Sequence, residues 1–415
     1  MNRINVCLME MTHAGNTSGV NRYVETLKTA LRTRPDFCVC HLQLEETPAL
    51  FFPAITTQAD GSWDARIPLP RTLTNLLEAT YWMERYNQQI WRIMKQHFFG
   101  NAPWLLHIHT LNLINMALFI KARIAGSRII THVHCIAWKG VMNYNKQLFK
   151  QLYSAYQAKT IDPKQFIRIG NELTAYSKAD QVICVTQCGK EFVERMTGRA
   201  DHICVIENGV PDHTGHTLSA STPLHSDSFH ALYVGVLSHS KGIRTILQAM
   251  ELLRQRGLTM QLTACGLYDT AVLNRLKEDY GHLSVNYTGI LPYEALEKFY
   301  STSHLGIIAS VQEQSSMAAI EMMKYGLPIV TTAADGLNEM FTDRVNALKV
   351  KVRYSSVHGL YVKPEDLAAA IQFMMMHPHE RIKMGHMARR TFENRFTADR
   401  MLKETVRTYQ QTLCL

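Results

Sequence analysis

The segment 310–328 carries the residue types best suited to chemistry. Glu313 and Glu321 flank a run of small residues, and each carboxylate can accept two hydroxyl donors, which suits the diols of a sugar or a ribose. Between them, Ser315 or Ser316 can cap a helix whose first N–H groups attract a phosphate. The pattern predicts a site for a phosphorylated sugar or a nucleotide, and a capped helix with two solvent-facing glutamates is the alternative.

Lys241 and Gly19 each stand where a predicted helix begins, after the loop or turn that follows a predicted strand. A cation at the positive end of a helix is electrostatically unfavourable unless it serves an anion, so Lys241 is a candidate phosphate ligand. The loop around Gly19 consists of small residues and lets a ligand approach the backbone closely. A surface lysine and an ordinary turn are the alternatives.

Two pairs of histidines follow predicted strands, His107 with His109 and His132 with His134. Because side chains alternate along a strand, the two imidazoles of a pair share one face. The spacing places no third ligand beside either pair, so the sequence predicts no metal site. Histidines with a purely structural role are the main alternative.

The elements that position these residues follow one pattern in both halves of the chain. Short apolar runs alternate with amphipathic stretches of about ten residues or more, which indicates βαβ units and parallel sheets. We predict strands near residues 3–9, 37–44, 104–108, 128–133, 181–186, 202–206, 230–236, 259–264, 284–287, 305–309, 328–332 and 347–350. This predicts an α/β chain of two doubly wound, Rossmann-like domains, in which ligands bind at the carboxyl ends of the strands.

The segment 211–228 is predicted to link the two domains, because it is rich in Ser, Thr, His and Pro. The first domain then covers residues 1–213 together with the C-terminal segment 396–415, and the second covers 225–395. Two domains also suit a length of 415 residues.

The composition is that of an ordinary globular chain, with 46% hydrophobic and 19% charged residues, which excludes a disordered or collagen-like protein. No run of about 18 apolar residues occurs, so no transmembrane helix is expected, and the N-terminus lacks the features of a signal peptide. The nine cysteines form no CxxC pair and lie mostly in apolar runs, which is typical of a reducing compartment. We therefore expect a cytoplasmic protein.

The segment 139–168 concentrates positive charge in a chain of net charge +9. Aromatic residues are interleaved with its lysines, namely Trp138, Tyr144, Phe149, Tyr153, Tyr156 and Phe166. Such a mixture suits peripheral contact with an anionic membrane at its inner face, whereas no recognition motif for nucleic acid is present. The alternative is that the aromatic residues pack inside the domain and the lysines only solvate it.

Taken together, these motifs resemble the retaining GT-B glycosyltransferases of family 4, also called glycosyl transferases group 1, over nearly the whole chain. The matching positions are the E-x7-E motif of Glu313 and Glu321 with Gly326-Leu327-Pro328 behind it, the turn Asn208-Gly209-Val210, the pair Lys241-Gly242 and the pair Gly19-Val20. The order and spacing of all four make the set specific. The resemblance implies two Rossmann-like domains that face each other across a cleft. The segment around Glu313 also resembles a branch of the family that is associated with peptide-modifying gene clusters.

The resemblance assigns roles to the side chains. Glu313 lies at the transferred sugar, Glu321 holds the ribose hydroxyls, and Lys241 neutralises the leaving diphosphate. His134, or alternatively His132, faces the acceptor pocket. The backbone N–H groups of Ser315, Ser316 and Met317 are expected to contact the diphosphate of the nucleotide sugar. Gly19 of the first domain is expected to contact the nucleotide sugar as well.

Two departures from the family pattern stand out. Gly235-Val236-Leu237 replaces the usual Gly-Arg-Leu, so the diphosphate arginine is missing, and Arg244 or His239 is the nearest substitute. Gln314-Ser315-Ser316 replaces the usual Gly-Phe-Gly, which weakens the transfer of the glycine roles to this chain.

The implied reaction is the transfer of a hexose from a UDP- or GDP-sugar, with retention, to a glycan, a lipid-linked or a peptide acceptor. Neither a metal ion nor a cofactor is expected. Two alternatives stay open. One is a catalytically weak or silent nucleotide-sugar-binding protein, and the other is a GT-B sugar-nucleotide epimerase.

Overall fold

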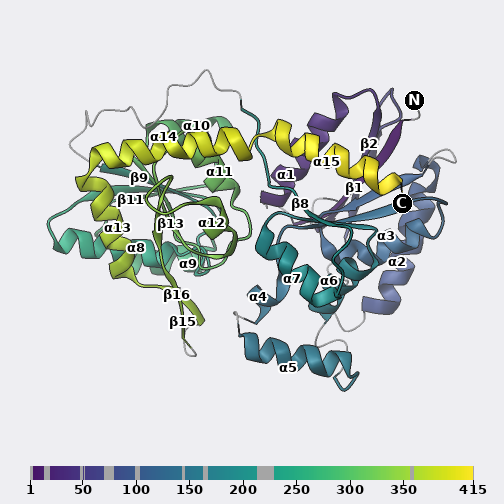
Figure 1. The fold of residues 1–415 in the computed structure, drawn as a ribbon, viewed down its shortest axis with the longest axis horizontal. Helices are drawn as coiled ribbons and strands as arrows, with labels where there is room; N and C mark the ends of the chain where they lie inside the picture. Colours follow the sequence, from purple (N-terminus) through teal and green to yellow (C-terminus); the bar gives the residue numbers. More distant parts are fainter. Residues whose placement is uncertain are drawn as a thin grey trace. The chain divides into compact units, whose positions relative to one another are not determined.

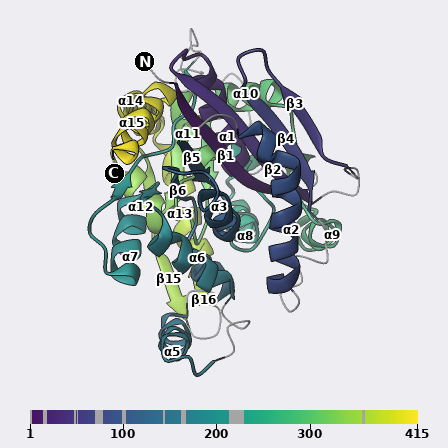
Figure 2. The same cartoon turned by 90° about the vertical axis from the view of Figure 1, so that its right-hand side faces the viewer.

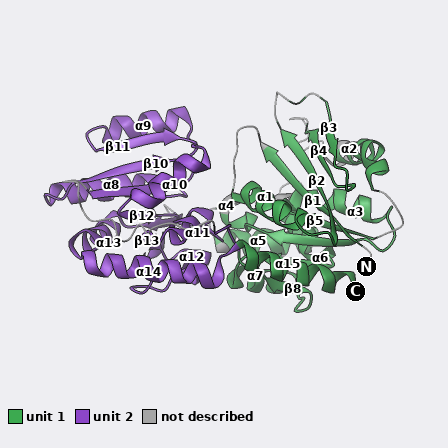
Figure 3. Ribbon diagram, turned by 90° about the horizontal axis from the view of Figure 1, so that it is seen from above, with its two compact units in different colours: residues 1–207, 398–415 green, residues 208–397 purple. Residues whose placement is uncertain are grey.

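The structure is a computed structural model in which the chain divides into two compact units (Figures 1 and 3). Unit 1 comprises Met1–Glu207 and Ala398–Leu415, and unit 2 comprises Asn208–Thr397. The described residues are 3–13, 19–46, 50, 52–69, 79–98, 103–142, 145–161, 167–212, 229–355 and 359–414.

Unit 1 contains, in its described residues, an eight-stranded sheet in the order β3-β4-β2-β1-β5-β6-β7-β8. Every neighbouring pair is parallel except β3 with β4. The strands are β1 (Ile4–His13), β2 (Phe37–Glu46), β3 (Ala54–Thr57), β4 (Trp63–Pro68), β5 (Trp104–Ile108), β6 (Arg128–Val133), β7 (Gln181–Cys184) and β8 (Ile203–Val205). Figure 2 shows β1, β2 and β4 side by side in this sheet.

Helices cover this sheet, so the side chains of its central strands are buried and mostly apolar. All five residues of β5 are buried, which a parallel sheet between two helical layers requires. The helices are α1 (Gly19–Arg32), α2 (Ala79–Met94), η2 (Lys95–His97), η3 (Leu111–Leu113), α3 (Ile114–Lys121), α4 (Ala137–Val141), α5 (Lys146–Gln157), α6 (Ile167–Lys178), α7 (Gln187–Thr197) and α15 (Ala398–Leu413). The C-terminal helix α15 belongs to unit 1 because Val406 and Tyr409 share one apolar cluster with Val6 and Leu8 of β1.

Unit 2 is a second parallel α/β layer structure. Its main sheet has six strands among the described residues, in the order β11-β10-β9-β12-β13-β14, and all pairs are parallel. The strands are β9 (Phe229–Val234), β10 (Met260–Cys265), β11 (Val285–Gly289), β12 (Leu305–Ile308), β13 (Ile329–Thr332) and β14 (Leu348–Val350). The helices are α8 (Ile243–Gln255), α9 (Thr270–Tyr280), α10 (Tyr293–Thr302), α11 (Met317–Lys324), α12 (Asp335–Met340), α13 (Pro364–Met376) and α14 (Pro378–Arg395).

Two antiparallel pairs were not predicted from the sequence. One is β3 with β4 in unit 1, and the other is β15 (Val352–Ser355) with β16 (Gly359–Val362) in unit 2. Strand β3 is mostly exposed, so it carries no hydrophobic alternation that would mark it. In β4 the alternate residues Trp63, Ala65 and Ile67 are buried, and this alternation is a signal that could have found the strand.

Two further findings concern helices and cysteines. In the part of the chain that the structure describes, no helix is both long enough and apolar enough to cross a membrane. No disulfide joins any of the nine cysteines, all of which are described.

Candidate functional site

Glu313 lies in the loop after β12, at the carboxyl end of the unit 2 sheet. Its side chain is 14% exposed, and its backbone carbonyl accepts a hydrogen bond of 2.9 Å from the N–H of Gly336. Ser316 caps α11, because its Oγ accepts a hydrogen bond of 3.2 Å from a backbone N–H in the first turn. Ser315 Oγ accepts a hydrogen bond of 3.1 Å from the side-chain amide of Asn208. Of the two serines that the sequence offered as a cap, Ser316 serves.

Lys241 lies beside Glu313, although 72 positions separate them in the chain. Its Nζ donates a hydrogen bond to Glu313 Oε2, and its side chain is 34% exposed. An ammonium group carries three donors, so Lys241 can keep this bond and still donate to a phosphate oxygen. The structure therefore brings together two residues predicted to act on the sugar and on the diphosphate.

The loops that carry this pair are joined through their backbones. Val311 N–H donates a hydrogen bond of 2.9 Å to the carbonyl of Ser240. Gly242 adopts φ 75°, and a Cβ at this position would lie only 2.1 Å from the carbonyl oxygen of Ala309. Only glycine permits this close approach, which explains why Lys241 is followed by glycine.

Glu321 lies in α11 and is 1% exposed. Its Oε2 accepts a hydrogen bond of 2.5 Å from the hydroxyl of Tyr300, which lies in α10 and is fully buried. Tyr300 could not be identified as a partner from the sequence, since the contact depends on how two helices pack. The role of Glu321 at the ribose stays a prediction.

The other predicted donor contacts lie at helix starts. Met317 is the first residue of α11 and Gly19 is the first residue of α1. Gly19 is exposed, and the loop of residues 14–18 before it lies outside the described residues. The predicted contacts of Ser315, Ser316 and Met317 with a diphosphate stay predictions.

Val236 stands where the family has an arginine, and Arg244, one of the two predicted substitutes, is engaged elsewhere. The side chain of Val236 is 42% exposed, so this position lies at the surface of unit 2. Arg244 instead donates a hydrogen bond of 2.8 Å to Asp279 in α9, in an ion pair exposed on both sides. Arg244 lies in the first turn of α8, and its guanidinium pairs with α9. Its ion-pair partner is therefore not Glu313, which pairs with Lys241. His239 is exposed.

Four histidines of unit 1 gather at the ends of β5 and β6, which are neighbouring parallel strands. His109 Nδ1 lies 3.1 Å from His134 Nε2, and His107 Nε2 lies 3.2 Å from His132 Nδ1. His107 Nδ1 also lies 2.7 Å from the hydroxyl of Tyr409 in α15. The sequence predicted each pair on one face of its strand, but it did not predict the contact between pairs or the C-terminal tyrosine.

Burial keeps these imidazoles uncharged. Desolvation lowers the pKa of His107 and of His134 to about 3, and it holds the pKa of His109 and His132 well below the ordinary value. Neighbouring imidazoles lower the pKa of His107, His109 and His132 further, because a second positive charge nearby would be repelled. At neutral pH the predicted acceptor-side residue His134 is therefore a hydrogen-bonding group rather than a cation.

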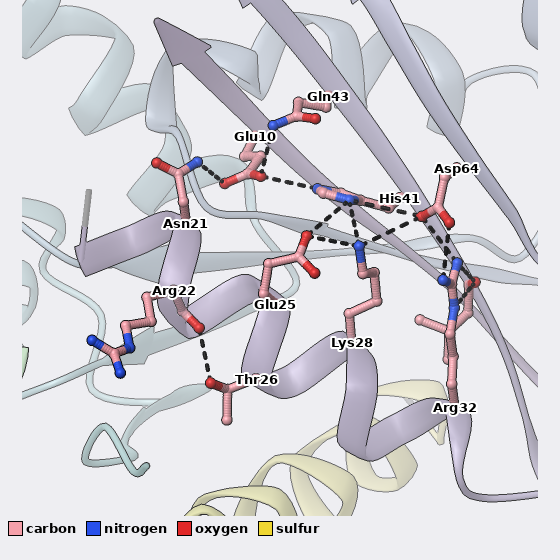
Figure 4. A network of polar contacts seen from close by, with 11 residues as sticks. Glu10, Asn21, Arg22, Glu25, Thr26, Lys28, Arg32, His41, Gln43 and Asp64 are labelled. Carbon is pink, nitrogen blue, oxygen red and sulfur yellow. Dashed lines mark hydrogen bonds and ion pairs between the residues drawn. The ribbon is translucent and has the colours of Figure 1, made fainter. Parts of the chain in front are cut away.

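A second polar network of unit 1, shown in Figure 4, positions α1 against the sheet. Glu10 on β1 is 1% exposed and accepts a hydrogen bond of 2.9 Å from Asn21 of α1, and one of its oxygens lies 3.0 Å from His41 Nε2. At the other end of α1, Arg32 makes two hydrogen bonds of 2.9 and 3.0 Å to Asp64 on β4. The network ties α1 to three strands and so holds the helix that begins with Gly19.

Two of the aromatic residues named for the basic segment, Trp138 and Phe149, are buried in unit 1. Trp138 and Phe149 are 5% and 7% exposed, and their rings stack at 4.6 Å between centroids. Tyr153 donates a hydrogen bond of 3.3 Å to the carbonyl of Met196 in α7. Tyr144 and Phe166 lie outside the described residues. The alternative of internal packing therefore holds for Trp138 and Phe149, and membrane contact stays a prediction that rests on the lysines.

Comparison with known families gives two matches that adjoin each other. The model described as "Glycosyl transferases group 1" matches residues 216–391, and the model described as "Glycosyltransferase Family 4" matches residues 17–213. An uncharacterized glycosyltransferase, MJ1607 of Methanocaldococcus jannaschii, is 26% identical over 60% of this chain and 64% of its own length. Mannosylfructose-phosphate synthase of Agrobacterium fabrum is 28% identical over 54% and 52%. The chain thus spans between half and two thirds of the length of these relatives.

Solved structures resemble the chain over nearly its full length. Sucrose-phosphate synthase from Thermosynechococcus elongatus gives a TM-score of 0.78 at 18% identity and covers 99% of this chain and 100% of its own. The Anabaena protein HepE in complex with UDP-glucose gives a TM-score of 0.68 at 14% identity, with 99% and 100% covered. These likenesses show the fold, which is the GT-B fold of two Rossmann-like domains, as the sequence predicted.

Proposed function

The chain belongs to the family-4, group 1 glycosyltransferases, and from this premise we propose that it transfers a hexose from a nucleoside-diphosphate sugar to an acceptor with retention of configuration. The observation that carries the proposal is the ion pair between Lys241 and Glu313, formed by two loops at the carboxyl end of the unit 2 sheet. In an open α/β sheet this is the edge at which ligands bind.

Lys241 is proposed to stabilise the leaving diphosphate. In a front-face substitution the bond between the anomeric carbon and the diphosphate oxygen breaks, and the acceptor oxygen forms its bond on the same face. The acceptor proton passes to the departing phosphate oxygen. Negative charge then grows on the diphosphate, and a donor held in advance at that place lowers the barrier.

Glu313 is proposed to contact the transferred sugar, since a carboxylate can accept two hydroxyl groups at once. Its ion pair with Lys241 holds the carboxylate in place before the donor arrives. Such advance positioning reduces the reorganisation that the transition state requires. Glu321, which lies on α11, is proposed to hold the ribose hydroxyls.

His134 is proposed to contact the sugar or the acceptor as a neutral group. Burial lowers its pKa to about 3, so it supplies a hydrogen bond and not a charge. His109, which lies 3.1 Å away, fixes the orientation of the His134 ring. His132, the alternative in the sequence, is fully buried and is therefore the weaker candidate for a substrate contact.

UDP-glucose is the first donor to test, because the solved structure of HepE contains it. The acceptor is proposed to be a glycan, a lipid-linked sugar or a peptide, and no cofactor besides the donor is needed. A thermal-shift screen with UDP-, GDP- and ADP-glucose identifies the base, since a ligand at about 100 times its Kd stabilises the folded chain by about 2.7 kcal/mol.

Release of radiolabelled hexose from the selected donor then tests catalysis, with Glu313→Gln as the matched variant. We expect release by the unchanged chain and a large loss in the variant. Stabilisation by a donor without any release would instead favour a silent nucleotide-sugar-binding protein, the candidate suggested by Val236 at the arginine position. No stabilisation by any of the three donors would contradict the proposed function.

A further inference from the structure

Three buried histidines of unit 1 lie close enough together to share one metal ion. His107, His109 and His132 each offer a ring nitrogen, and these nitrogens all lie within 4.8 Å of one another. All three side chains are buried, with at most 4% exposed. We propose that this histidine cluster binds one divalent transition-metal ion, with Zn²⁺ as the first probe. The proposal concerns unit 1 alone and goes beyond the proposed transfer reaction.

Two of the ring nitrogens lack a hydrogen-bond partner within the described residues. These are Nε2 of His109 and Nε2 of His132, and both atoms are buried. Leaving a buried polar atom unsatisfied costs about 1–3 kcal/mol, so such atoms call for an explanation. A metal ion explains both, because each neutral imidazole nitrogen can give its lone pair to the ion.

In His109 and His107, the second ring nitrogen already has a hydrogen-bond partner, as is usual in histidines that bind a metal. His109 Nδ1 contacts His134 Nε2 at 3.1 Å, and His107 Nδ1 contacts the Tyr409 hydroxyl at 2.7 Å. Histidines that bind a metal through one nitrogen usually engage the other in such a hydrogen bond, which fixes the tautomer and the ring orientation. With Nδ1–H of His109 donated to His134, its Nε2 carries the lone pair that a metal ion requires.

Binding requires a local rearrangement. His107 Nε2 now contacts His132 Nδ1 at 3.2 Å, and one lone pair cannot both accept a hydrogen bond and coordinate an ion. Zn–N distances of about 2.0–2.1 Å also require the three nitrogens to draw closer together than the present 4.8 Å limit. The ion therefore replaces the hydrogen bond between His107 and His132, while the contacts with His134 and Tyr409 are kept.

The donor set selects the class of ion. Three imidazoles without a carboxylate suit Zn²⁺, Cu²⁺, Ni²⁺ or Co²⁺, whereas Ca²⁺ and Mg²⁺ prefer oxygen ligands. Three protein ligands leave a fourth position for water. The sequence predicted no metal site because each strand supplies only two histidines, and the pairing of β5 with β6 brings in the third.

The test uses the full chain stripped with a chelator and dialysed against buffered Zn²⁺, with bound metal counted by mass spectrometry. We expect one Zn²⁺ per chain, and at least about tenfold weaker binding in His109→Gln and in His132→Gln. Tyr409→Phe removes only the partner of His107 and should weaken binding about 10–100-fold, the range typical of such supporting contacts. The control is His379→Gln, which changes an exposed histidine of unit 2 and should bind as the unchanged chain does.

A second readout covers the case in which a variant fails to fold. Co²⁺ added to the unchanged chain should give the intense visible absorption of a four-coordinate ion and should be displaced by Zn²⁺. A stoichiometry well below one Zn²⁺ per chain, or equal binding by the unchanged chain and His109→Gln, would overturn the proposal. A Co²⁺ spectrum identical to that of the aquo ion would overturn it as well.

Discussion

The Lys241–Glu313 pair of unit 2 and the histidine cluster of unit 1 are built in opposite ways. The first is charged and partly open to solvent, with side chains 34% and 14% exposed. The second is uncharged and buried, and ring nitrogens of His107 and His132 lie 3.2 Å apart. An open ion pair can exchange partners with an incoming anion, whereas a buried neutral cluster acts through fixed orientation. The two regions should therefore respond differently to substitution.

Lys241→Ala should produce the largest effect on catalysis. Removal of one preorganised donor to a developing charge lowers kcat by about 10²–10³. The free energy of unfolding should change by less than about 1 kcal/mol, because the pair is partly exposed and such pairs contribute little. Donor turnover and urea denaturation measure the two quantities. Lys277→Ala, which changes an exposed lysine of α9, is the control, and equal losses of turnover in both variants would contradict the assignment.

Glu172 offers a buried carboxylate of unit 1 to compare with Glu313. Burial raises its pKa from 4.5 to about 7, although the carboxylate accepts hydrogen bonds from Tyr176 and from the N–H of Ala137. Because the folded state prefers the protonated form, Glu172 contributes stability that is fully present below pH 4.5 and is lost as the pH rises to about 7. The four buried histidines, whose pKa values are lowered, contribute the opposite dependence, because their stability is lost as the pH falls. Glu172→Gln should remove only the Glu172 contribution, so the free energy of unfolding of the variant should rise more steeply between pH 4.5 and about 7 than that of the unchanged chain. Urea denaturation across this pH range measures it, and an unchanged slope in the variant would show that Glu172 is not the group responsible.

Tyr409→Phe should destabilise unit 1 without touching unit 2. It leaves Nδ1 of the buried His107 without the hydroxyl at 2.7 Å, which costs about 1–3 kcal/mol. Chemical denaturation measures the loss, and Tyr354→Phe, at a tyrosine of unit 2 that is 53% exposed, is the control. If both variants unfold at the same denaturant concentration, the hydrogen bond to His107 contributes nothing to stability.

Val236→Arg should have the smallest effect on stability. The side chain is 42% exposed, so the longer side chain extends into solvent and the free energy of unfolding should change by about 0.5 kcal/mol or less. Restoring the family arginine should leave turnover unchanged or raise it. Val234→Arg, at a partly buried residue of β9 that packs on the apolar core, is the destabilising comparison. Unfolding of Val236→Arg itself would mean that the resemblance misplaces the arginine.

The sequence indicated a ligand site that includes Lys241 and Glu313, although not their ion pair, and it did not indicate the histidine cluster. Lys241 and Glu313 each follow a strand of a parallel sheet, and the carboxyl ends of such strands meet at one edge, so their proximity follows from the fold class. The contacts of His107 with His132 and Tyr409 depend on which strands are neighbours and on where α15 docks. The spacing of residues along the chain does not contain this information.

The side-chain partners of Arg244 and Glu321 and the strand β3 also could not be predicted from the sequence. Arg244 lies in the first turn of α8, close to Lys241 in the chain, but its guanidinium donates a hydrogen bond to Asp279 on α9. The partner of Glu321, Tyr300, comes from the packing of α10 against α11. The antiparallel strand β3 has four residues, of which only Ile55 is partly buried, and it therefore gives no signal in a pattern of buried strands.

Binding of the nucleoside diphosphate that the donor screen selects tests most directly whether unit 2 holds the donor diphosphate. Isothermal titration calorimetry measures its Kd. Lys241→Ala should weaken binding by about 10–150-fold, since a charge-assisted hydrogen bond contributes about 1.5–3 kcal/mol. His134→Ala should leave the Kd unchanged, because the account assigns His134 to the sugar or the acceptor and not to the diphosphate. Unchanged affinity in Lys241→Ala together with weakened affinity in His134→Ala would contradict the central claim that unit 2 holds the donor diphosphate.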